Sequence, residues 1–355
     1  MSKTAQDNPI LVELTRGALV ESSHRGAIAV ADAEGRLALA LGAIERPVYP
    51  RSAVKALQAI PLIESGAAEA FGLGESELAI ACASHSAEAL HLAAVRTLLT
   101  KAGLDERQLA CGAHWPISER AMRELMRAGQ RPEAIHNNCS GKHTGMLATA
   151  LHRGVDPRGY EQPDHPVQED IRRVISEVCG VELERGAMGI DGCSVPTFAL
   201  PLHPLATGFA RLASGKGLSQ TRAAAVQRLM GACFAAPVLV AGEERFDTIV
   251  MRGLGPAAFV KGGAEGVHCA ALPELGIGIA LKIDDGAKRA AETALAFLLA
   301  RLVAGAEQVL SDQLEGDIRN WRGLKVGWLR ASAELMAALE GLPRPTRVAA
   351  AAAPR

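Results

Sequence analysis

The segment RSAVK pairs two residues that could break an amide bond. Ser52 and Lys55 are three residues apart, which places them one turn apart on the same face of a helix. A neutral lysine at this position could take the proton of the serine hydroxyl, and backbone N–H groups at the helix start could hold an oxyanion. Taken alone, the motif can also be explained without catalysis, as a serine N-cap beside a solvated lysine.

Two further clusters could add a second hydroxyl and a second amine. Ser84 lies within CASHS, after an apolar run, and Lys261 ends the segment AAFVKGG. Reactive side chains are common where an element meets a loop, and glycines after a lysine allow a close backbone approach. Each cluster can also be explained alone, as a turn that caps or connects its neighbours.

The stretch NNCSGKHTG contains a thiol, hydroxyls, an amine and an imidazole. Its Cys139 and His143 are common zinc-ligand types, as are Asp191 and Cys193 in the later segment IDGCSVPT. No C-x-x-C pair accompanies these four residues. The residues leave two interpretations open, a metal site or two buried cysteines beside a capped helix.

Composition excludes several classes of protein. The 355 residues are 48% hydrophobic and 22% charged, with a formal net charge of -1, as in ordinary globular enzymes. Without a basic block, nucleic acid is not expected as a partner. The first residues do not show a charged region followed by an apolar run, and no apolar run reaches membrane-spanning length, so we expect a cytoplasmic protein without membrane contact. Seven cysteines without an export signal argue against a disulfide framework.

The apolar patterns predict helices and strands from all parts of the chain. A hairpin is expected over 25–42, and short strands over 77–84, 257–263 and 276–286. Helices are expected over 52–72, 87–103, 143–154, 164–180, 220–234 and 287–303. This order predicts an α+β fold, in which an antiparallel sheet built from distant segments packs with helices. We expect one catalytic domain over residues 1–345 and a low-complexity tail over 346–355.

Seven short blocks together resemble one family. They are SSHRG, RSAVK, CASHS, NNCSGKH, DHPVQ, IDGCSVPT and VAGEERF, in this order. They resemble the bacterial L-asparaginases of the rhizobial type, the asparaginase II family. The resemblance implies a fold like that of serine β-lactamases and glutaminases, a homodimer, and hydrolysis of L-asparagine to L-aspartate and ammonia.

The resemblance also assigns roles to residues. It implies catalytic roles for Ser52, Lys55, Ser84 and Lys261. It implies a zinc ion bound by Cys139, Lys142 and Cys193, so that Lys142 replaces His143 as the expected ligand. Substrate contacts are expected from Arg51, His85, Asp191 and His143.

The expected reaction passes through an acyl-enzyme on Ser52, with Lys55 as base, while Ser84 and Lys261 relay a proton to departing ammonia. Ser84 as the acylated serine is the alternative within this scheme. Other interpretations are an L-glutaminase, and a zinc-dependent amidohydrolase in which metal-bound water attacks. A non-enzymatic thiol- or zinc-binding protein that uses Cys139 and Cys193 is the remaining one.

Overall fold

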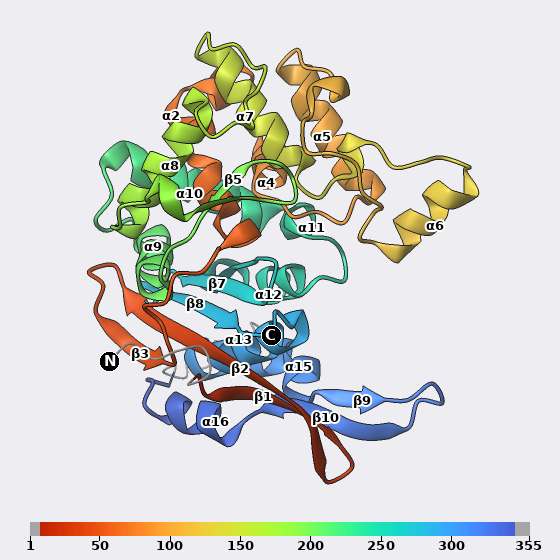
Figure 1. Cartoon of the computed structure of the whole chain (residues 1–355), viewed down its shortest axis with the longest axis vertical. Helices are drawn as coiled ribbons and strands as arrows, with labels where there is room; N and C mark the ends of the chain where they lie inside the picture. Colours follow the sequence, from red (N-terminus) through yellow and green to blue (C-terminus); the bar gives the residue numbers. More distant parts are fainter. Residues whose placement is uncertain (1–7, 345–355) are drawn as a thin grey trace, which may run out of the picture.

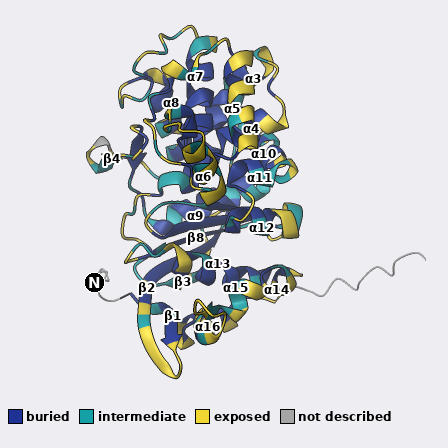
Figure 2. Ribbon diagram, turned by 90° about the vertical axis from the view of Figure 1, so that its right-hand side faces the viewer, coloured by how far each residue is buried: buried dark blue, intermediate teal, exposed yellow. Residues whose placement is uncertain are grey.

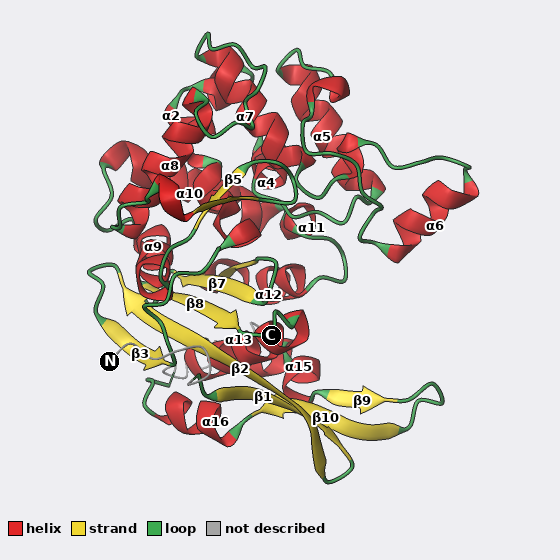
Figure 3. Cartoon of the chain, viewed as in Figure 1, coloured by secondary structure: helices red, strands yellow, loops and turns green. Residues whose placement is uncertain are grey.

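The computed structural model describes residues 8–344 of the chain. In Figure 1 the strands of the main sheet lie in the lower half of the molecule together with the last helices of the chain, and most other helices form the upper half. Figure 3 shows the same division by secondary structure. The predicted tail, 346–355, lies outside the described residues, and the predicted extent of the catalytic domain over 1–345 stays a prediction.

The main sheet has eight strands in the order β6-β7-β8-β2-β1-β10-β9, with β3 also paired to β2. Each of its described strand pairs is antiparallel. The strands are β1 (Ile10–Arg16), β2 (Leu19–Asp32), β3 (Leu37–Leu41), β6 (Phe259–Gly262), β7 (Val267–Leu272), β8 (Ile277–Ile283), β9 (Asp317–Arg319) and β10 (Lys325–Ala331). A separate pair joins β4 (Met188–Ile190) to β5 (Pro196–Phe198). The predicted antiparallel sheet from distant segments is therefore confirmed.

Strand β2 organises this sheet because it is long enough to serve two sets of neighbours. Its first half pairs with β1, and its second half pairs with β3 on one side and β8 on the other. Ile28, in the second half, is fully buried and lies opposite Leu41 and Leu281. The predicted hairpin over 25–42 is the β2–β3 part of this arrangement.

The helical layer comes from the chain between β3 and β6. Its helices are α1 (Lys55–Gln58), α2 (Ile60–Glu64), α3 (Ala67–Ala70), α4 (Glu75–Ala81), α5 (Ala89–Lys101), α6 (Glu119–Arg127), α7 (Ser140–His152), α8 (Pro166–Cys179), α9 (Leu202–Ser214), α10 (Gln220–Ala235), α11 (Pro237–Val240) and α12 (Phe246–Leu254). The 3₁₀ turns are η2 (Arg51–Val54), η3 (Glu106–Gln108), η4 (Ala134–His136), η5 (Arg185–Ala187) and η6 (Gly255–Ala257). The remaining helices follow β8 in the chain, and they are α13 (Lys288–Leu302), α14 (Ala306–Val309), α15 (Ser311–Glu315) and α16 (Ala333–Glu340).

Helices cover both faces of the sheet. Strand β7 is buried along its whole length, which requires apolar cover on either side. Helix α9 packs on β8, β2 and β7, and α13 packs on β8, β7, β1 and β10. Figure 2 shows β8 between these two helices and the most continuous burial in the helical layer and central strands. None of the helices within residues 8–344 is long and apolar enough to cross a membrane.

The predicted strand over 77–84 is wrong, because residues 77–81 of this segment belong to helix α4 (Glu75–Ala81). Burial explains the error, since five consecutive residues of α4, Glu77 to Ala81, are buried. A short run buried on all sides shows no helical period, so the pattern does not separate helix from strand. The side chain of Glu77 accepts a hydrogen bond from the Gly74 N–H at 2.7 Å, which stabilises the helix start.

The predicted helix over 52–72 is divided into η2, α1, α2 and α3. Pro61 lies in the first turn of α2, where its missing N–H costs little. Strand β7 was not expected, because only its neighbours β6 and β8 were recognised as strands. The other five predicted helices are present as α5, α7, α8, α10 and α13.

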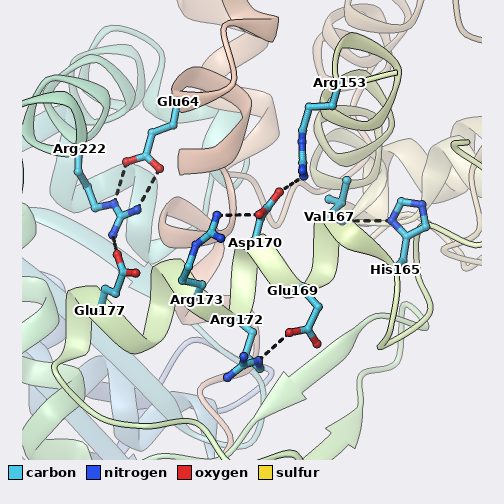
Figure 4. A network of polar contacts seen from close by, with 10 residues as sticks. All are labelled: Glu64, Arg153, His165, Val167, Glu169, Asp170, Arg172, Arg173, Glu177 and Arg222. Atoms are coloured by element: carbon cyan, nitrogen blue, oxygen red, sulfur yellow. Dashed lines mark hydrogen bonds and ion pairs between the residues drawn. The ribbon is translucent and has the colours of Figure 1, made fainter. Parts of the chain in front are cut away.

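Ion pairs tie the helical layer together around α8 (Figure 4). Arg222 of α10 binds Glu64 of α2 through two hydrogen bonds of 2.7 and 3.0 Å, and it also pairs with Glu177 of α8. Asp170 of α8 pairs with Arg153, just after α7. These contacts fix α2, α7 and α10 relative to α8, and α2 follows directly on the segment that carries Ser52 and Lys55.

Candidate active site

A single hydroxyl bridges two buried lysines. The Oγ atom of Ser84 lies 2.9 Å from Nζ of Lys55 and 3.1 Å from Nζ of Lys261. Both lysines are fully buried, and Ser84 is 5% exposed. The three residues come from α1, the turn after α4 and β6, so only the fold brings them together. They form a continuous path along which a proton can move.

The sequence expectation paired Lys55 with Ser52, but the described hydrogen bonds of Lys55 go elsewhere. Its amine donates to the carbonyl oxygens of Ala83 at 2.6 Å and Asn138 at 3.2 Å, besides contacting Ser84. Ser52 is partly exposed, and its hydroxyl has no hydrogen-bond partner within residues 8–344. Three oxygen acceptors suit a protonated Lys55, while the Ser52 hydroxyl is left free to face a substrate.

Lys261 has fewer acceptors and is easier to deprotonate. Burial lowers its pKa to about 8, the nearby cation of Lys55 acts in the same direction, and the carboxylate of Asp247 opposes both. Besides Ser84, its amine contacts the Gly262 carbonyl at 3.0 Å. A lysine with a pKa near neutrality can both accept and return a proton, so the two lysines have different roles along the path.

Two glycines allow the elements of the site to approach one another. A Cβ atom on Gly263, directly after β6, would lie 2.6 Å from the carbonyl oxygen of Pro50, beside η2. A Cβ atom on Gly141, in α7, would lie 2.2 Å from the carbonyl oxygen of Ile80 in α4. Gly263 therefore admits the protein's own backbone rather than a ligand, and Gly141 lets α7 pack closely against α4.

Arg51 and Asp191 form an ion pair beside Ser52. Nε and Nη2 of Arg51 both contact Oδ1 of Asp191, at 2.8 and 2.6 Å. Although burial opposes it, the cations of Lys142 and Arg51 lower the pKa of Asp191, so this residue is a carboxylate. Its Oδ2 atom and the Nη1 atom of Arg51 have no hydrogen bond to the described residues. An anionic and a cationic group therefore stand side by side with binding capacity left over.

The sulfurs of Cys139 and Cys193 meet next to Lys142. The Lys142 amine lies 3.1 Å from the Cys193 sulfur. A hydrogen bond from the Cys193 thiol lowers the pKa of Cys139 well below its ordinary value, and the same bond together with burial raises the pKa of Cys193. Burial disfavours the charge on Lys142, but the two sulfurs and Asp191 raise its pKa. The directions of these pKa shifts favour negative charge on Cys139 and positive charge on Lys142.

These three groups fit the donor set expected for zinc. A tetrahedral zinc ion holds a sulfur and a nitrogen ligand about 3.5 Å apart, close to the observed separation of 3.1 Å between Lys142 and Cys193. Residues 8–344 contain no cluster of three or more His, Cys, Asp and Glu side chains placed to bind a metal. A metal at this place would need Lys142 as its third protein ligand, with Lys142 losing a proton on binding.

His143 points a neutral N–H group into the interior. The Tyr160 hydroxyl accepts a hydrogen bond from the Ala110 N–H at 2.9 Å. Its own proton has an acceptor in Nδ1 of His143, 2.6 Å away, in the tautomer that leaves this nitrogen unprotonated. The proton of the imidazole is then on Nε2, which is buried without a partner among the described residues. Burial and the nearby lysines hold the pKa of His143 well below its usual value.

His85, the other histidine expected to contact substrate, is fully buried with both ring nitrogens engaged. Nδ1 accepts a hydrogen bond from the Ala87 N–H at 3.1 Å, and Nε2 lies 2.8 Å from the Ser140 hydroxyl. The ring also stacks on His91, with 5.3 Å between centroids. This geometry favours a structural role, in which His85 joins the Ser84 segment to the start of α7.

The motifs with no expected role include residues that support this site. In DHPVQ, His165 caps α8 through the Val167 N–H, and Gln168 donates to the Tyr160 carbonyl at 2.8 Å. Asp247, two residues after the arginine of VAGEERF, lies 3.6 Å from the Lys261 amine. Blocks of this kind signal importance in the sequence, but their spacing does not show which neighbour each residue meets.

Two solved structures are similar to the chain at low identity. Mglu in its native form is 15% identical, with 87% of this chain and 69% of that chain covered and a TM-score of 0.40. A β-lactamase from Mycobacterium bovis is 12% identical, with 81% and 94% covered and a TM-score of 0.39. At these scores the likeness carries no argument about activity. No curated protein matches the chain at a significant level.

The family model for L-asparaginase II matches residues 12–331. The match covers all the residues of the Ser84 bridge, the Arg51–Asp191 pair and the cysteine cluster, and it extends over most of the 355 residues. The chain therefore belongs to the L-asparaginase II family and is an amidohydrolase of the asparaginase type.

Proposed function

We propose that the protein hydrolyses L-asparagine to L-aspartate and ammonia through an acyl-enzyme on Ser52. The observation that carries the proposal is the Ser84 hydroxyl held between the amines of Lys55 and Lys261. Such a bridge has no evident structural purpose, because burying two lysine amines side by side is unfavourable. It is suited to moving protons during the cleavage of an amide.

Ser52 is the proposed nucleophile because its hydroxyl is accessible and free. As Ser52 attacks the side-chain amide carbon, its proton passes to Lys55, while a proton of Lys55 moves through Ser84 to neutral Lys261. Backbone N–H groups at the start of η2 stabilise the oxyanion. The stored proton then returns along the same path to the nitrogen of the breaking C–N bond, and ammonia leaves. Water releases L-aspartate by the reverse series of transfers.

The Arg51–Asp191 pair matches the charged end of an amino acid. Asp191 can accept a hydrogen bond from the substrate ammonium through Oδ2, and the unused guanidinium nitrogen of Arg51 can bind the carboxylate. The Nε2–H group of His143 supplies a neutral donor. These contacts would fix the substrate so that its amide carbon lies against Ser52.

Zinc is the proposed cofactor, held by Cys139, Lys142 and Cys193. When bound, the ion would supply a fixed positive charge that draws substrate oxygen and orders the loop beside Asp191. The three ligands belong to the segment before α7, the first turn of α7 and the loop between β4 and β5. A bound ion would therefore join the start of α7 to the loop between β4 and β5.

The resemblance to the rhizobial-type enzymes also supports a homodimer and a cytoplasmic location, and we include both in the proposal. Sedimentation velocity on the purified protein tests the assembly. A fusion of the full chain to a fluorescent protein, followed by cell fractionation, tests the location.

The central experiment measures ammonia release from L-asparagine and L-glutamine, with and without added zinc. We expect turnover of asparagine, and an acyl group on the peptide that contains Ser52 when the reaction is quenched and analysed by mass spectrometry. An acyl group on Ser84 would reverse the roles of the two serines. Full activity of Ser52→Ala together with complete loss on chelation would instead support a zinc hydrolase, and a glutamine preference would support a glutaminase.

A further inference from the structure

A second polar group, Asp247 with His268, lies next to Lys261. Asp247 is in the first turn of α12, and His268 lies on β7, which pairs with β6 so that His268 stands opposite Gly262. Figure 1 shows α12 beside β7. The Oδ1 atom of Asp247 is 2.8 Å from Nε2 of His268, and both residues are 3% exposed.

The second oxygen of the Asp247 carboxylate faces the segment that carries the catalytic lysine. Its Oδ2 atom accepts a hydrogen bond from the Gly262 N–H at 3.0 Å and lies 3.6 Å from the Lys261 amine. A buried carboxylate is costly unless it is paired and hydrogen-bonded. Although burial opposes it, His268 and Lys261 hold the pKa of Asp247 well below its usual range, so the group is charged.

We propose that Asp247 is a positioning residue of the amidase site: with His268 behind it, its carboxylate holds the Lys261 amine against Ser84 and controls the protonation of that amine. The proposal rests on the proposed function, in which Lys261 stores a proton. Asp247 touches neither the substrate nor the Ser84 hydroxyl in this scheme, and acts only through Lys261.

The charges around Lys261 explain why one carboxylate has a measurable effect. The Ser84 hydroxyl contacts its amine. The charged groups that act on it from other elements are the Asp247 carboxylate, the Lys55 amine from α1, the Arg245 guanidinium from before α12 and the Cys139 sulfur from before α7. The two cations and burial lower the pKa of Lys261, and Asp247 is the strongest opposing influence. Without Asp247, Lys261 would lose its proton at a lower pH.

A polar cavity with room for water borders the pair. Its lining includes Asp247, Gly262, His268 and Lys288, and its volume is about 50 Å³. An ordered water molecule needs only about 10–15 Å³. Enlarging the cavity at His268 would therefore hydrate the Asp247 carboxylate and weaken its effect on Lys261.

The test is the pH profile of kcat/KM for L-asparagine in Asp247→Asn. Lys261 must be neutral to accept the proton, so activity of the unaltered protein rises with pH through the pKa of Lys261. With the neutral amide, we expect this rise to move to lower pH by about 1–3 units, and the plateau kcat to fall while KM changes little.

The control is Asp285→Asn. Asp285 lies 2.7 Å from His24, so this variant also removes an Asp–His pair, but one that does not face Lys261. Its profile should not move.

A purely structural role for Asp247 would lower the melting temperature and the amount of active protein without moving the profile. A folded Asp247→Asn protein whose profile matches the unaltered one therefore overturns the proposal. If Asp247→Asn does not fold, His268→Ala replaces it: the rise should move in the same direction by a smaller amount, and His268→Gln should restore it. An unchanged pH profile in His268→Ala also overturns the proposal.

The failure of the proposed function gives a different result. If the unaltered protein releases no ammonia from L-asparagine, the proposed function is wrong. If Lys261→Met keeps normal asparaginase activity, Lys261 stores no proton, and the proton path on which the role of Asp247 rests is wrong. If Lys261→Met is inactive while the Asp247 and His268 variants keep the original profile, the proposed function stands and only the role of Asp247 is wrong.

Discussion

The amine of Lys55 lies 2.9 Å from the hydroxyl oxygen of Ser84, although 29 positions separate the two residues. Lys55 thus contacts a distant hydroxyl rather than that of Ser52, which shares its motif. The same hydroxyl contacts Lys261 at 3.1 Å. The two expected serine–lysine pairs are therefore one connected group, and this connection is the basis of the predictions on catalysis.

Removing the hydroxyl of Ser84 should break the path between the lysines but leave the nucleophile in place. We expect Ser84→Ala to lower kcat by about 10²–10⁴-fold, the usual range for loss of proton transfer. Ser52→Ala should lose more than about 10³-fold. The matched control is Ser86→Ala, since Ser86 only donates to the Ala241 carbonyl at 2.8 Å. Steady-state ammonia release checks all three, and a Ser84→Ala protein with normal kcat would contradict the bridge.

The buried lysine at the end of the path predicts the pH dependence. The pKa of Lys261 is lowered to about 8, and the neutral form accepts the proton. Below this pH, kcat/KM should fall about tenfold per unit as the amine becomes protonated. Ammonia release measured between pH 6 and 10 checks the profile. A flat profile through pH 8, in a protein shown to be folded over the whole range, would exclude Lys261 as the proton store.

The Arg51–Asp191 pair should govern recognition of the amino-acid end of the substrate. Arg51→Lys removes the two-nitrogen contact with Asp191, and charged hydrogen bonds are worth about 1.5–3 kcal/mol. We therefore expect kcat/KM to fall roughly 10–100-fold, with little change in melting temperature. Arg330→Lys, in an exposed pair with Glu13, is the control. If Arg51→Lys keeps the original kcat/KM as the control does, the Arg51–Asp191 pair does not bind the substrate.

Zinc should stabilise the folded protein through its cysteine ligands. At a zinc concentration 100 times the Kd, binding only the native state adds about 2.7 kcal/mol to the free energy of unfolding. Melting temperature and metal content should both rise with zinc, and Cys139→Ser and Cys193→Ser should abolish the rise. Cys111→Ser is the control, because burial raises the pKa of this neighbouring thiol to about 12.

The affinity for zinc should also depend on pH. Lys142 has a raised pKa and must lose its proton to bind a metal. The affinity should therefore weaken as pH falls, and zinc binding should release a proton that calorimetry in buffers of different ionisation enthalpy can count. Zinc binding that is unchanged between pH 6 and 9 would rule out Lys142 as a ligand.

The close approach of α7 to α4 makes one glycine of NNCSGKHTG sensitive to substitution. In Gly141→Ala the new Cβ would lie 2.2 Å from the Ile80 carbonyl oxygen, and relieving such overpacking costs about 1–3 kcal/mol. Gly145 provides the control one turn later, where a Cβ would meet its nearest neighbour at an ordinary 3.4 Å. Urea unfolding should show a loss of stability for Gly141→Ala and little change or a gain for Gly145→Ala.

Part of the fold could be predicted from periodicity. The long helices α5, α8 and α13 carry end signals and apolar spacing that the sequence displays directly. The segment of α4 could not be assigned in this way, because it is buried on all sides and its helical period is hidden. Strand β7 was missed although Gly266 precedes it and Pro273 follows it, because its whole length is buried and the run therefore shows no alternation of apolar and polar residues.

The residues available for the chemistry could be recognised in the sequence. The short blocks carry Ser52, Ser84 and the two cysteines, Lys261 follows in AAFVKGG, and the resemblance names the family. Which groups meet depends on the tertiary structure: Lys55 contacts Ser84, Asp247 lies near Lys261, and Cys193 contacts Lys142. Local spacing fixes neighbours within one element, whereas contacts between elements depend on how α1, α7, α12 and β6 pack around a shared core.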